Sequence, residues 1–319
     1  MPSRRRGIVL FALKLGVSAS LLALLFSRLG AEDALGLLAG AHVPLLLAGA
    51  ACLLGQTALS TFKWYLLLRA QGMRVAYLPL LKMYFASNFI NLFLPGVLGG
   101  DAYRAAKLRH HTQGVRAALP SILVDRGTGI ATLLAAGTLG MALVFFREHF
   151  VPIVIGLVLS MALGYLLIIG PFARMAGRVR SGAYFGLFGV LAQVARALQP
   201  SPTFFCAVAI SLVFHFNTVL INWIYSLAAG IDVTFPQLLV IVPAVYLVEM
   251  IPISINGIGV REGTFTVLFA QLGLVPEHGL VLGLTVTVMR YVAGIVGGVL
   301  LATDLLGRRG GAAPVQGSG

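Results

Sequence analysis

The chain has 319 residues, of which 59% are hydrophobic and only 10% are charged, and its mean hydropathy is +0.95. Soluble domains carry about a quarter charged residues, so this composition excludes an ordinary soluble enzyme. The net charge of +13 does not indicate nucleic-acid binding, because the basic residues gather in short loops between apolar runs. That distribution is typical of the cytoplasmic side of membrane proteins.

Six apolar runs are long enough to cross a membrane as helices. About 20 apolar residues in helical form span the bilayer core of about 30 Å. The runs cover Ile8–Ser27, Val43–Leu68, Ala117–Phe146, Val151–Pro171, Thr203–Ala229 and Gly279–Leu305. The first run follows three arginines but exceeds the apolar core of about 7–15 residues in a cleaved signal peptide. We therefore interpret it as a retained anchor helix.

The loops between these runs differ in charge. Basic residues occupy both ends of the chain and the loops at residues 101–116 and 174–196, whereas Asp232 and Glu277 mark acidic loops. Short basic loops face the cytoplasm. The sequence therefore predicts a multi-pass protein of the cytoplasmic (inner) membrane with both termini in the cytoplasm.

One further apolar stretch, Met83–Gly100, has basic loops on both sides. It contains Pro95, Gly96, Gly99 and Gly100, and proline and glycine break helices. We predict that this stretch enters from the cytoplasm and returns there as a re-entrant hairpin.

A second interrupted stretch, Phe235–Val275, lies between acidic loops and is broken at Ile251–Gly263. It forms either a full helical hairpin with a cytoplasmic tip or a re-entrant pair that dips in from outside, and the charges allow both. Broken apolar segments in the two halves of a chain indicate an inverted-repeat transporter whose binding site lies at the breaks. The opposed directions of entry are the main support for this reading.

Charged residues in or beside the membrane sum to zero. A charge near the bilayer centre costs about 2.5–3.5 kcal/mol on insertion scales, so each needs a partner or a polar cavity. In one interpretation they join helices as ion pairs. In the other, the arginines hold an anionic headgroup, because the guanidinium fork gives phosphate two parallel hydrogen bonds. The pairs expected in the first interpretation are Asp101–Arg104, Glu249–Arg290 and Asp125–Arg261.

Other residues within the apolar runs receive simpler interpretations. Asn88 and Asn91 share one helical face leading into the first break. Lys63 lies near enough to a cytoplasmic helix end for its ammonium group to snorkel to the interface. We expect His215 to hydrogen-bond between helices, and the small residues of Gly294–Gly298 to allow close helix packing.

Two long motifs carry a family resemblance. Residues 91–104 read Asn-x-x-Leu-Pro-Gly-x-x-Gly-Gly-Asp-x-x-Arg, and residues 254–263 read Ser-Ile-Asn-Gly-Ile-Gly-Val-Arg-Glu-Gly. With Asp125-Arg126, this pattern resembles the lysylphosphatidylglycerol synthase transmembrane-region (flippase-like) family. The resemblance implies a bacterial-type inner-membrane domain that moves lipid. In fused relatives the domain translocates aminoacylated phosphatidylglycerol made by a cytosolic aminoacyltransferase domain, and we expect this chain to be a stand-alone member without that domain.

We therefore predict an all-α polytopic protein with six full spans and two opposed interrupted hairpins. Residues 1–306 are expected to form one transmembrane domain and residues 307–319 a disordered cytoplasmic tail. The expected function is translocation of an anionic phospholipid, polyprenyl-phosphate or glycolipid headgroup across the membrane. The alternative is a scaffold or accessory subunit for a lipid-modifying or glycosyl-transferring enzyme.

The sequence has no metalloprotease, phosphate-loop or nucleophile-elbow motif, so we predict no enzymatic activity, catalytic residue, cofactor or metal. Membrane lipids are the expected partners; a lipid-modifying or glycosyltransferase protein and a second copy of the chain are compatible with this reading, and nucleic acid is not. The predicted headgroup cleft comprises Asn88, Asn91, Pro95, Gly96, Gly99, Gly100, Asp101, Arg104, Asp125, Arg126, Glu249, Asn256, Gly257, Gly259, Arg261, Glu262 and Arg290.

Overall fold

The structure is a computed structural model that describes residues 2–29, 36, 39–93, 98–108, 115–164, 194, 198 and 201–310. Within these residues every regular element is a helix. The helices are α1 (Pro2–Leu29), α3 (Val43–Ala70), α4 (Tyr77–Phe93), α5 (Leu98–Leu108), α6 (Val115–Phe145), the short 3-10 helix η1 (Arg147–His149), α7 (Phe150–Gly164), α10 (Pro202–Ala228), α11 (Phe235–Glu249), α12 (Val260–Gln271) and α13 (Pro276–Gly310).

The predicted all-α polytopic membrane protein is confirmed. Within the described part, α3, α6, α10 and α13 are each long and apolar enough to cross a bilayer. Helix α1 covers the first predicted span, and α7 covers the start of the fourth, whose remainder lies outside the described residues. Large apolar side chains point outward from these helices, such as Leu159 (62% exposed) and Phe205 (61% exposed). So much exposed apolar surface suits contact with lipid rather than water.

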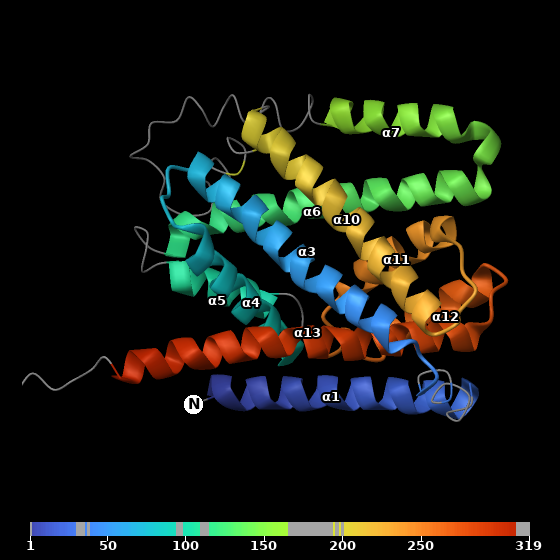
Figure 1. The fold of residues 1–319 in the computed structure, drawn as a ribbon, viewed down its shortest axis with the longest axis horizontal. Helices are drawn as coiled ribbons and strands as arrows, with labels where there is room; N and C mark the ends of the chain where they lie inside the picture. The colour runs from blue at the N-terminus through green and yellow to red at the C-terminus, as the bar shows by residue number, and fades with distance from the viewer. Residues whose placement is uncertain are drawn as a thin grey trace, which may run out of the picture.

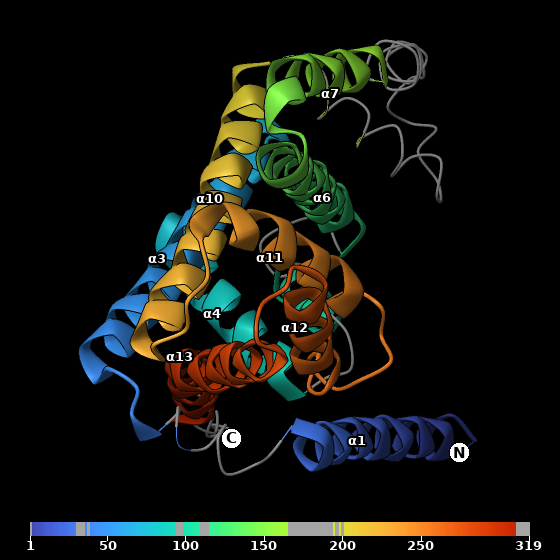
Figure 2. The same cartoon turned by 90° about the vertical axis from the view of Figure 1, so that its right-hand side faces the viewer.

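Helices α1, α6, α7 and α13 run roughly along the long axis of the molecule, and α3 and α10 cross them obliquely (Figure 1). The start of α1 and the last described turns of α13 lie at the same end of this axis, at the left of the figure. Helices α3 and α10 lie side by side, α11 and α12 lie between α6 and α13, and α1 stands at one side of the bundle (Figure 2). Helix α13 ends at Gly310, so residues 307–310 of the predicted tail continue the helix and residues 311–319 lie outside the described residues.

Two pairs of shorter helices enter the bundle from opposite ends. The α4–α5 pair enters from the end that holds the start of α1, and the α11–α12 pair enters from the other end (Figure 1). At 1.5 Å per residue, the 15 residues of α11 and the 12 residues of α12 cover about 22 and 18 Å. Neither helix can cross a core of about 30 Å, so the second stretch is a re-entrant pair rather than a full hairpin.

Local chemistry explains where the second pair breaks. Helix α11 begins with a capping box, in which Thr234 and Gln237 bond to each other's backbone N–H groups, and it ends at Glu249. The chain then passes through three left-handed residues, Asn256 (φ 50°), Gly257 (φ 77°) and Gly259 (φ 83°). Residues other than glycine rarely adopt this backbone conformation. The backbone therefore cannot continue as a helix until Val260, where α12 begins.

Helix α1 packs against this break. The Ser18 hydroxyl accepts a hydrogen bond from the backbone N–H of Ile255 at 3.2 Å. A Cβ atom on Gly259 would lie 2.7 Å from the Cβ of Leu21, a separation that real side chains do not tolerate. Glycine is therefore required at residue 259 both by its backbone angle and by the approach of α1.

The predicted small-residue packing of α13 is confirmed. At Gly298 a Cβ atom would lie 2.8 Å from the ring of Phe89, and at Gly297 it would overlap the backbone carbonyl of Phe85. Helix α13 therefore contacts α4 almost backbone to backbone, which joins the last full span to the first broken pair.

Candidate functional site

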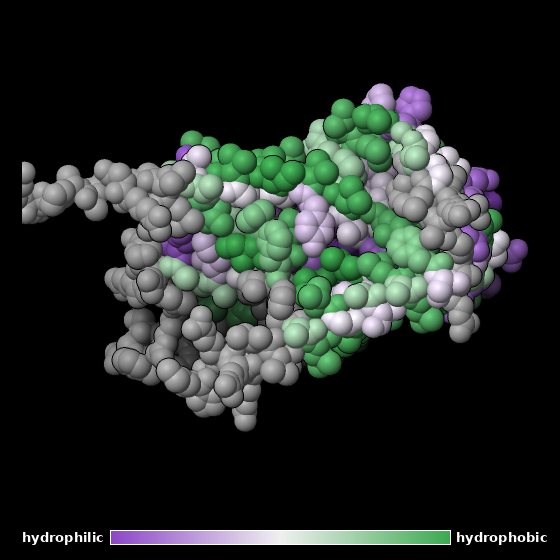
Figure 3. Space-filling view, turned by 90° about the horizontal axis from the view of Figure 1, so that it is seen from below, coloured by the Kyte–Doolittle hydropathy of each residue, from purple (hydrophilic) through white to green (hydrophobic). Residues whose placement is uncertain are grey.

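A cavity of about 380 Å³ lies between the two broken helix pairs. Its wall combines residues of α3, α4, α5, α6, α10, α11 and α13 with the irregular turn between α11 and α12. Viewed from the side of α1 and α13, the surface is mostly hydrophobic, and hydrophilic residues are visible in a recess across its middle (Figure 3). A cavity lined by both apolar and charged side chains thus lies within a largely hydrophobic exterior.

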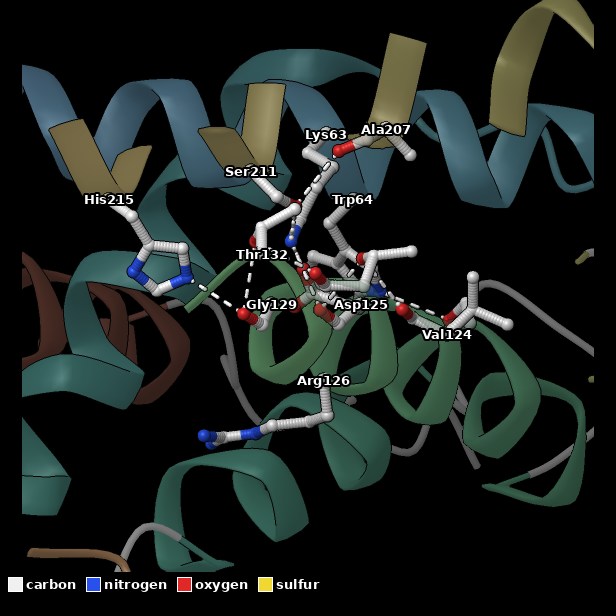
Figure 4. A network of polar contacts seen from close by, with 12 residues as sticks. Lys63, Trp64, Val124, Asp125, Arg126, Gly129, Thr132, Ala207, Ser211 and His215 are labelled. Atoms are coloured by element: carbon white, nitrogen blue, oxygen red, sulfur yellow. Dashed lines mark hydrogen bonds and ion pairs between the residues drawn. The ribbon is translucent and has the colours of Figure 1, made fainter. Parts of the chain in front are cut away.

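One set of ionic contacts, the first cluster (Lys63, Asp101, Arg104, Asp125 and Arg126), joins α3, α5 and α6. The Lys63 ammonium lies 2.7 Å from Asp125 Oδ1 and also donates to the Ser211 hydroxyl at 3.0 Å. Figure 4 shows Lys63 and Ser211 converging on Asp125, while Arg126 extends away from them. Asp125 also accepts from Arg104 at 3.4 Å, so a single carboxylate holds two cations in place.

Within the first cluster, Asp101 bridges two arginines. One of its oxygens accepts from Arg104 at 2.5 Å and the other from Arg126 at 2.8 Å. The guanidinium carbon of Arg104 also lies 4.9 Å from the ring of Trp64 and 4.4 Å from that of Tyr84. Arg104 is buried among these groups, whereas 31% of the Arg126 side chain is exposed. All three cations of this cluster line the cavity, and Arg126 is the most exposed of them.

The second cluster (Glu249, Arg261, Glu262 and Arg290) joins α11, α12 and α13. Glu249 accepts from the Nε of Arg261 and from Arg290 at 3.1 Å. Arg261 also donates to the Thr287 hydroxyl at 2.5 Å and to the backbone carbonyl of Asn256 at 2.8 Å. These contacts fasten the turn between α11 and α12 to α13.

Glu262 completes the second cluster from the start of α12. One carboxylate oxygen accepts from the Thr287 hydroxyl at 2.5 Å, and the other accepts from the N–H of Gly259 at 2.6 Å. The second contact caps the helix. Glu262 and Arg261 are both enclosed, whereas 19% of the Arg290 side chain remains exposed, stacked over the ring of Tyr246. Arg290 is thus the cation of the second cluster that faces the cavity.

The structure brings most of the predicted cleft residues to this cavity. The cavity wall includes Asn88, Asn91, Asp101, Arg104, Asp125, Arg126, Glu249, Asn256, Gly257 and Arg290. Five others do not line the cavity and lie at the start of α5 or of α12, namely Gly99, Gly100, Gly259, Arg261 and Glu262. The remaining two, Pro95 and Gly96, lie outside the described residues.

One predicted ion pair is wrong and two are present. Asp101–Arg104 and Glu249–Arg290 form as expected. The pair between Asp125 and Arg261 does not form, because Asp125 bonds to Lys63 and Arg104 while Arg261 bonds to Glu249. Each broken pair therefore keeps its charges within its own half of the protein.

The interpretation of Lys63 as a snorkelling residue is also wrong. Its side chain is buried, because it turns inward between α6 and α10 to reach Asp125 and Ser211. The carboxylate of Asp125, 2.7 Å away, stabilises the buried ammonium group. The side chain therefore does not need to extend to the membrane interface. His215 behaves as predicted: its Nε2 lies 2.8 Å from the carbonyl oxygen of Gly129 on α6.

Sequence reasoning missed several polar residues of the cavity wall. They are Gln56, Thr57, Ser60, Lys63, Tyr84, Ser87, Ser211, Tyr246 and Ser254. One signal was present on α3, where Gln56, Thr57, Ser60 and Lys63 recur at intervals of three or four residues within an apolar run. That spacing places polar groups on one helical face, which is unusual for a helix surrounded by lipid.

The geometry can be compared with known proteins. A family model described as the lysylphosphatidylglycerol synthase TM region matches residues 11–298. The chain belongs to this family. The match spans both broken helix pairs and all the residues of the two clusters, so the cavity lies entirely within the matched region. No curated protein and no solved structure matches the chain.

Proposed function

We propose that this protein moves the headgroup of an anionic lipid across the cytoplasmic membrane. The observation that carries the proposal is the cavity between two oppositely directed broken helix pairs, with Arg126 and Arg290 partly accessible within it. A polar headgroup needs such a compartment, because exposing charge to the bilayer core costs about 2.5–3.5 kcal/mol even on insertion scales. The lipid chains can remain in the bilayer while the headgroup passes through the protein.

The carboxylates have a defined part in this proposal. Asp101 holds Arg126, and Glu249 holds Arg290, so neither arginine is an unpaired charge while the cavity is empty. A lipid phosphate can share these guanidinium groups, because each guanidinium offers five N–H donors. The substrate class is an anionic phospholipid, a polyprenyl phosphate or a glycolipid, and the protein acts as a transporter rather than an enzyme.

The opposed entry of the two pairs suits alternating access. The two short helix pairs enter the bundle from opposite ends, and residues of both pairs line the cavity (Figure 1). Transporters with inverted, broken helices expose a central site by moving one such unit against the other. Membership of a lipid-synthase transmembrane family is in keeping with a lipid cargo.

The test is lipid movement by the purified protein in liposomes. Fluorescent lipids with different headgroups are placed in both leaflets, and a membrane-impermeant quencher then reports how much lipid reaches the outer leaflet. We expect faster exchange of anionic lipids in liposomes that contain the protein than in empty liposomes. Lys82→Gln provides the control, because Lys82 is exposed on α4 outside the cavity. Failure to move any lipid would overturn the proposal and favour an accessory role for a lipid-modifying enzyme.

A further inference from the structure

A second hollow lies at the surface between α4 and α13, which pack against each other. It has a volume of about 410 Å³. We call it the lateral groove; its lining, which is mainly apolar, consists of Phe89, Leu92, Phe93, Thr287, Val288, Tyr291, Val292 and Ile295. Several of these side chains are exposed, among them Phe93, Val288 and Ile295. An exposed apolar groove on a membrane protein is suited to contact with hydrocarbon chains.

The lateral groove and the cavity share one wall, the seam along which α4 meets α13. On α13, Arg290 lines the cavity, whereas Tyr291 and Ile295 line the groove. On α4, the buried side chain of Leu92 lines both. Successive residues of a helix point about 100° apart, so α13 presents one side to the cavity and another to the groove. The two hollows therefore lie on opposite sides of the seam.

The seam is closed by backbone at one place and by a side chain at another. At Gly297 of α13, a Cβ atom would overlap the backbone carbonyl of Phe85. At Gly294, a Cβ atom would instead overlap the Cδ1 atom of Leu92, the tip of a side chain. A side chain can change its rotamer, whereas two touching backbones separate only if a whole helix moves. Leu92 is therefore the residue whose movement would connect the cavity with the groove.

Other contacts hold the seam together beside Leu92. Helix α4 ends at Phe93, and the last carbonyls of a helix lack partners within it. The hydroxyl of Tyr291 donates a hydrogen bond to one of these carbonyls, that of Leu92, at 3.2 Å. The ring centroids of Phe93 and Tyr291 lie 6.3 Å apart. These contacts fix the end of α4 next to α13 without using the Leu92 side chain.

The chemistry of the groove identifies what occupies it. Lipid tails are as apolar as the groove, so the hydrophobic effect gives a chain no reason to prefer it to the bilayer. A chain stays in the groove when its headgroup is held nearby, because the tether raises its effective concentration there. Arg290 of the cavity and Tyr291 of the groove are adjacent on α13. A headgroup at Arg290 would therefore have its acyl chains within reach of the groove.

We propose that the lateral groove binds an acyl chain of the lipid whose headgroup lies in the cavity, and that this chain leaves the cavity past Leu92. The apolar chain, rather than the charged headgroup, crosses the apolar seam. This inference rests on the proposed transport function and adds to it the site of the lipid chain. Unselected bilayer lipid and a second copy of the protein are the alternative occupants.

Photo-crosslinking in liposomes tests the site. Phosphatidylglycerol and phosphatidylcholine carry the same acyl chain with a diazirine, and mass spectrometry identifies the residues that each lipid labels after illumination. We expect phosphatidylglycerol to label the residues of the lateral groove at least fivefold more strongly than phosphatidylcholine does. Phe205 and Val213, which are exposed on α10 outside the groove, should be labelled equally by both.

Charge variants test whether the headgroup holds the chain in place. Arg290→Gln should abolish the preference for phosphatidylglycerol in the groove and leave the labelling of α10 unchanged. Arg69→Gln is the matched control, because Arg69 is exposed near the end of α3 and does not line the cavity. It should preserve the preference. A preference that survives Arg290→Gln would overturn the link between the groove and the cavity.

Variants of the groove and the seam test the path of the chain. Val292→Trp fills the groove from an exposed position, so it should leave the fold intact and slow the transfer of phosphatidylglycerol at least fivefold. Val213→Trp makes the same change on α10 and should have no effect. Leu92→Ala should speed transfer several-fold, and the milder Leu92→Val should speed it less. Unchanged transfer by Val292→Trp, or slower transfer by Leu92→Val, would overturn the proposed path.

The outcomes separate this inference from the transport proposal. Selective labelling of the groove without lipid movement would retain the chain site and overturn transport. Lipid movement with equal labelling by both lipids would retain transport and show that the groove holds unselected bilayer lipid. No labelling of the groove by either lipid would show that protein covers it. Either of the last two results would overturn the chain site.

Discussion

Arg261 and Arg290 are expected to respond differently to the same substitution, because one is enclosed and the other faces the cavity. Arg261 is 1% exposed and donates to Glu249, Thr287 and the carbonyl of Asn256. In Arg261→Lys, a compact ammonium replaces the planar fork and cannot reach all three acceptors. Hydrogen bonds to charged groups contribute about 1.5–3 kcal/mol each, so losing two lowers the free energy of unfolding by about 3–6 kcal/mol.

Arg290→Lys should reduce lipid transfer more than it reduces stability. Arg290 contacts Glu249 at 3.1 Å and lines the cavity, while Glu249 retains Arg261 as a second partner. We expect a smaller stability loss, of about 1.5–3 kcal/mol, the contribution of one hydrogen bond to a charged group. Lipid transfer should fall at least tenfold, because lysine retains the charge but cannot form two parallel bonds to a phosphate.

Both properties are measured on one preparation, by thermal unfolding in detergent and by lipid transfer in liposomes. Arg69→Lys is the matched control, since Arg69 is exposed near the end of α3, and it should change neither property. Adding Glu249→Gln to Arg261→Met should recover part of the stability that Arg261→Met loses, because it removes the carboxylate left underpaired. Parental stability of Arg261→Lys, or normal transfer by Arg290→Lys, would refute this assignment of roles.

Three further predictions follow from packing and topology. Lys63→Met should destabilise the protein by about 3–5 kcal/mol, because it removes the cation 2.7 Å from the buried Asp125 and leaves the longer contact with Arg104 at 3.4 Å. The double variant with Asp125→Asn should be less destabilised in detergent melts, and an unchanged melt for Lys63→Met would contradict the pairing. Gly297→Leu should separate α13 from the α4 backbone and abolish transfer while lowering thermal stability; full activity would contradict the close packing. In a chain without its two native cysteines, a cysteine at the exposed position Val275 should react with an impermeant reagent from outside, and one at the exposed position Arg74 only after lysis; the reverse pattern would invert the predicted topology.

The helical architecture could be predicted almost completely from the sequence. The six apolar runs, the breaks near residues 94–100 and 251–259, and the opposed loop charges all depend on residues that are adjacent in the chain. Hydropathy, helix breaking and loop charge are local properties. The choice between a full hairpin and a re-entrant pair for Phe235–Val275 needed the structure, because it depends on where α11 ends and α12 begins.

The residues that line the cavity were partly predictable from the sequence, whereas the ion pairs among them were not. Predicted residues such as Asn91, Arg126 and Arg290 do line it, because a charged or amide side chain within an apolar run needs a polar environment. The partner of each charge depends on the depth and rotation of helices that are distant in sequence. The structure turns Lys63 inward to Asp125 and separates Asp125 from Arg261. Since electrostatic energy varies steeply with separation in a low-dielectric interior, only the packing of α3 against α6 and α10 decided which cation pairs with Asp125.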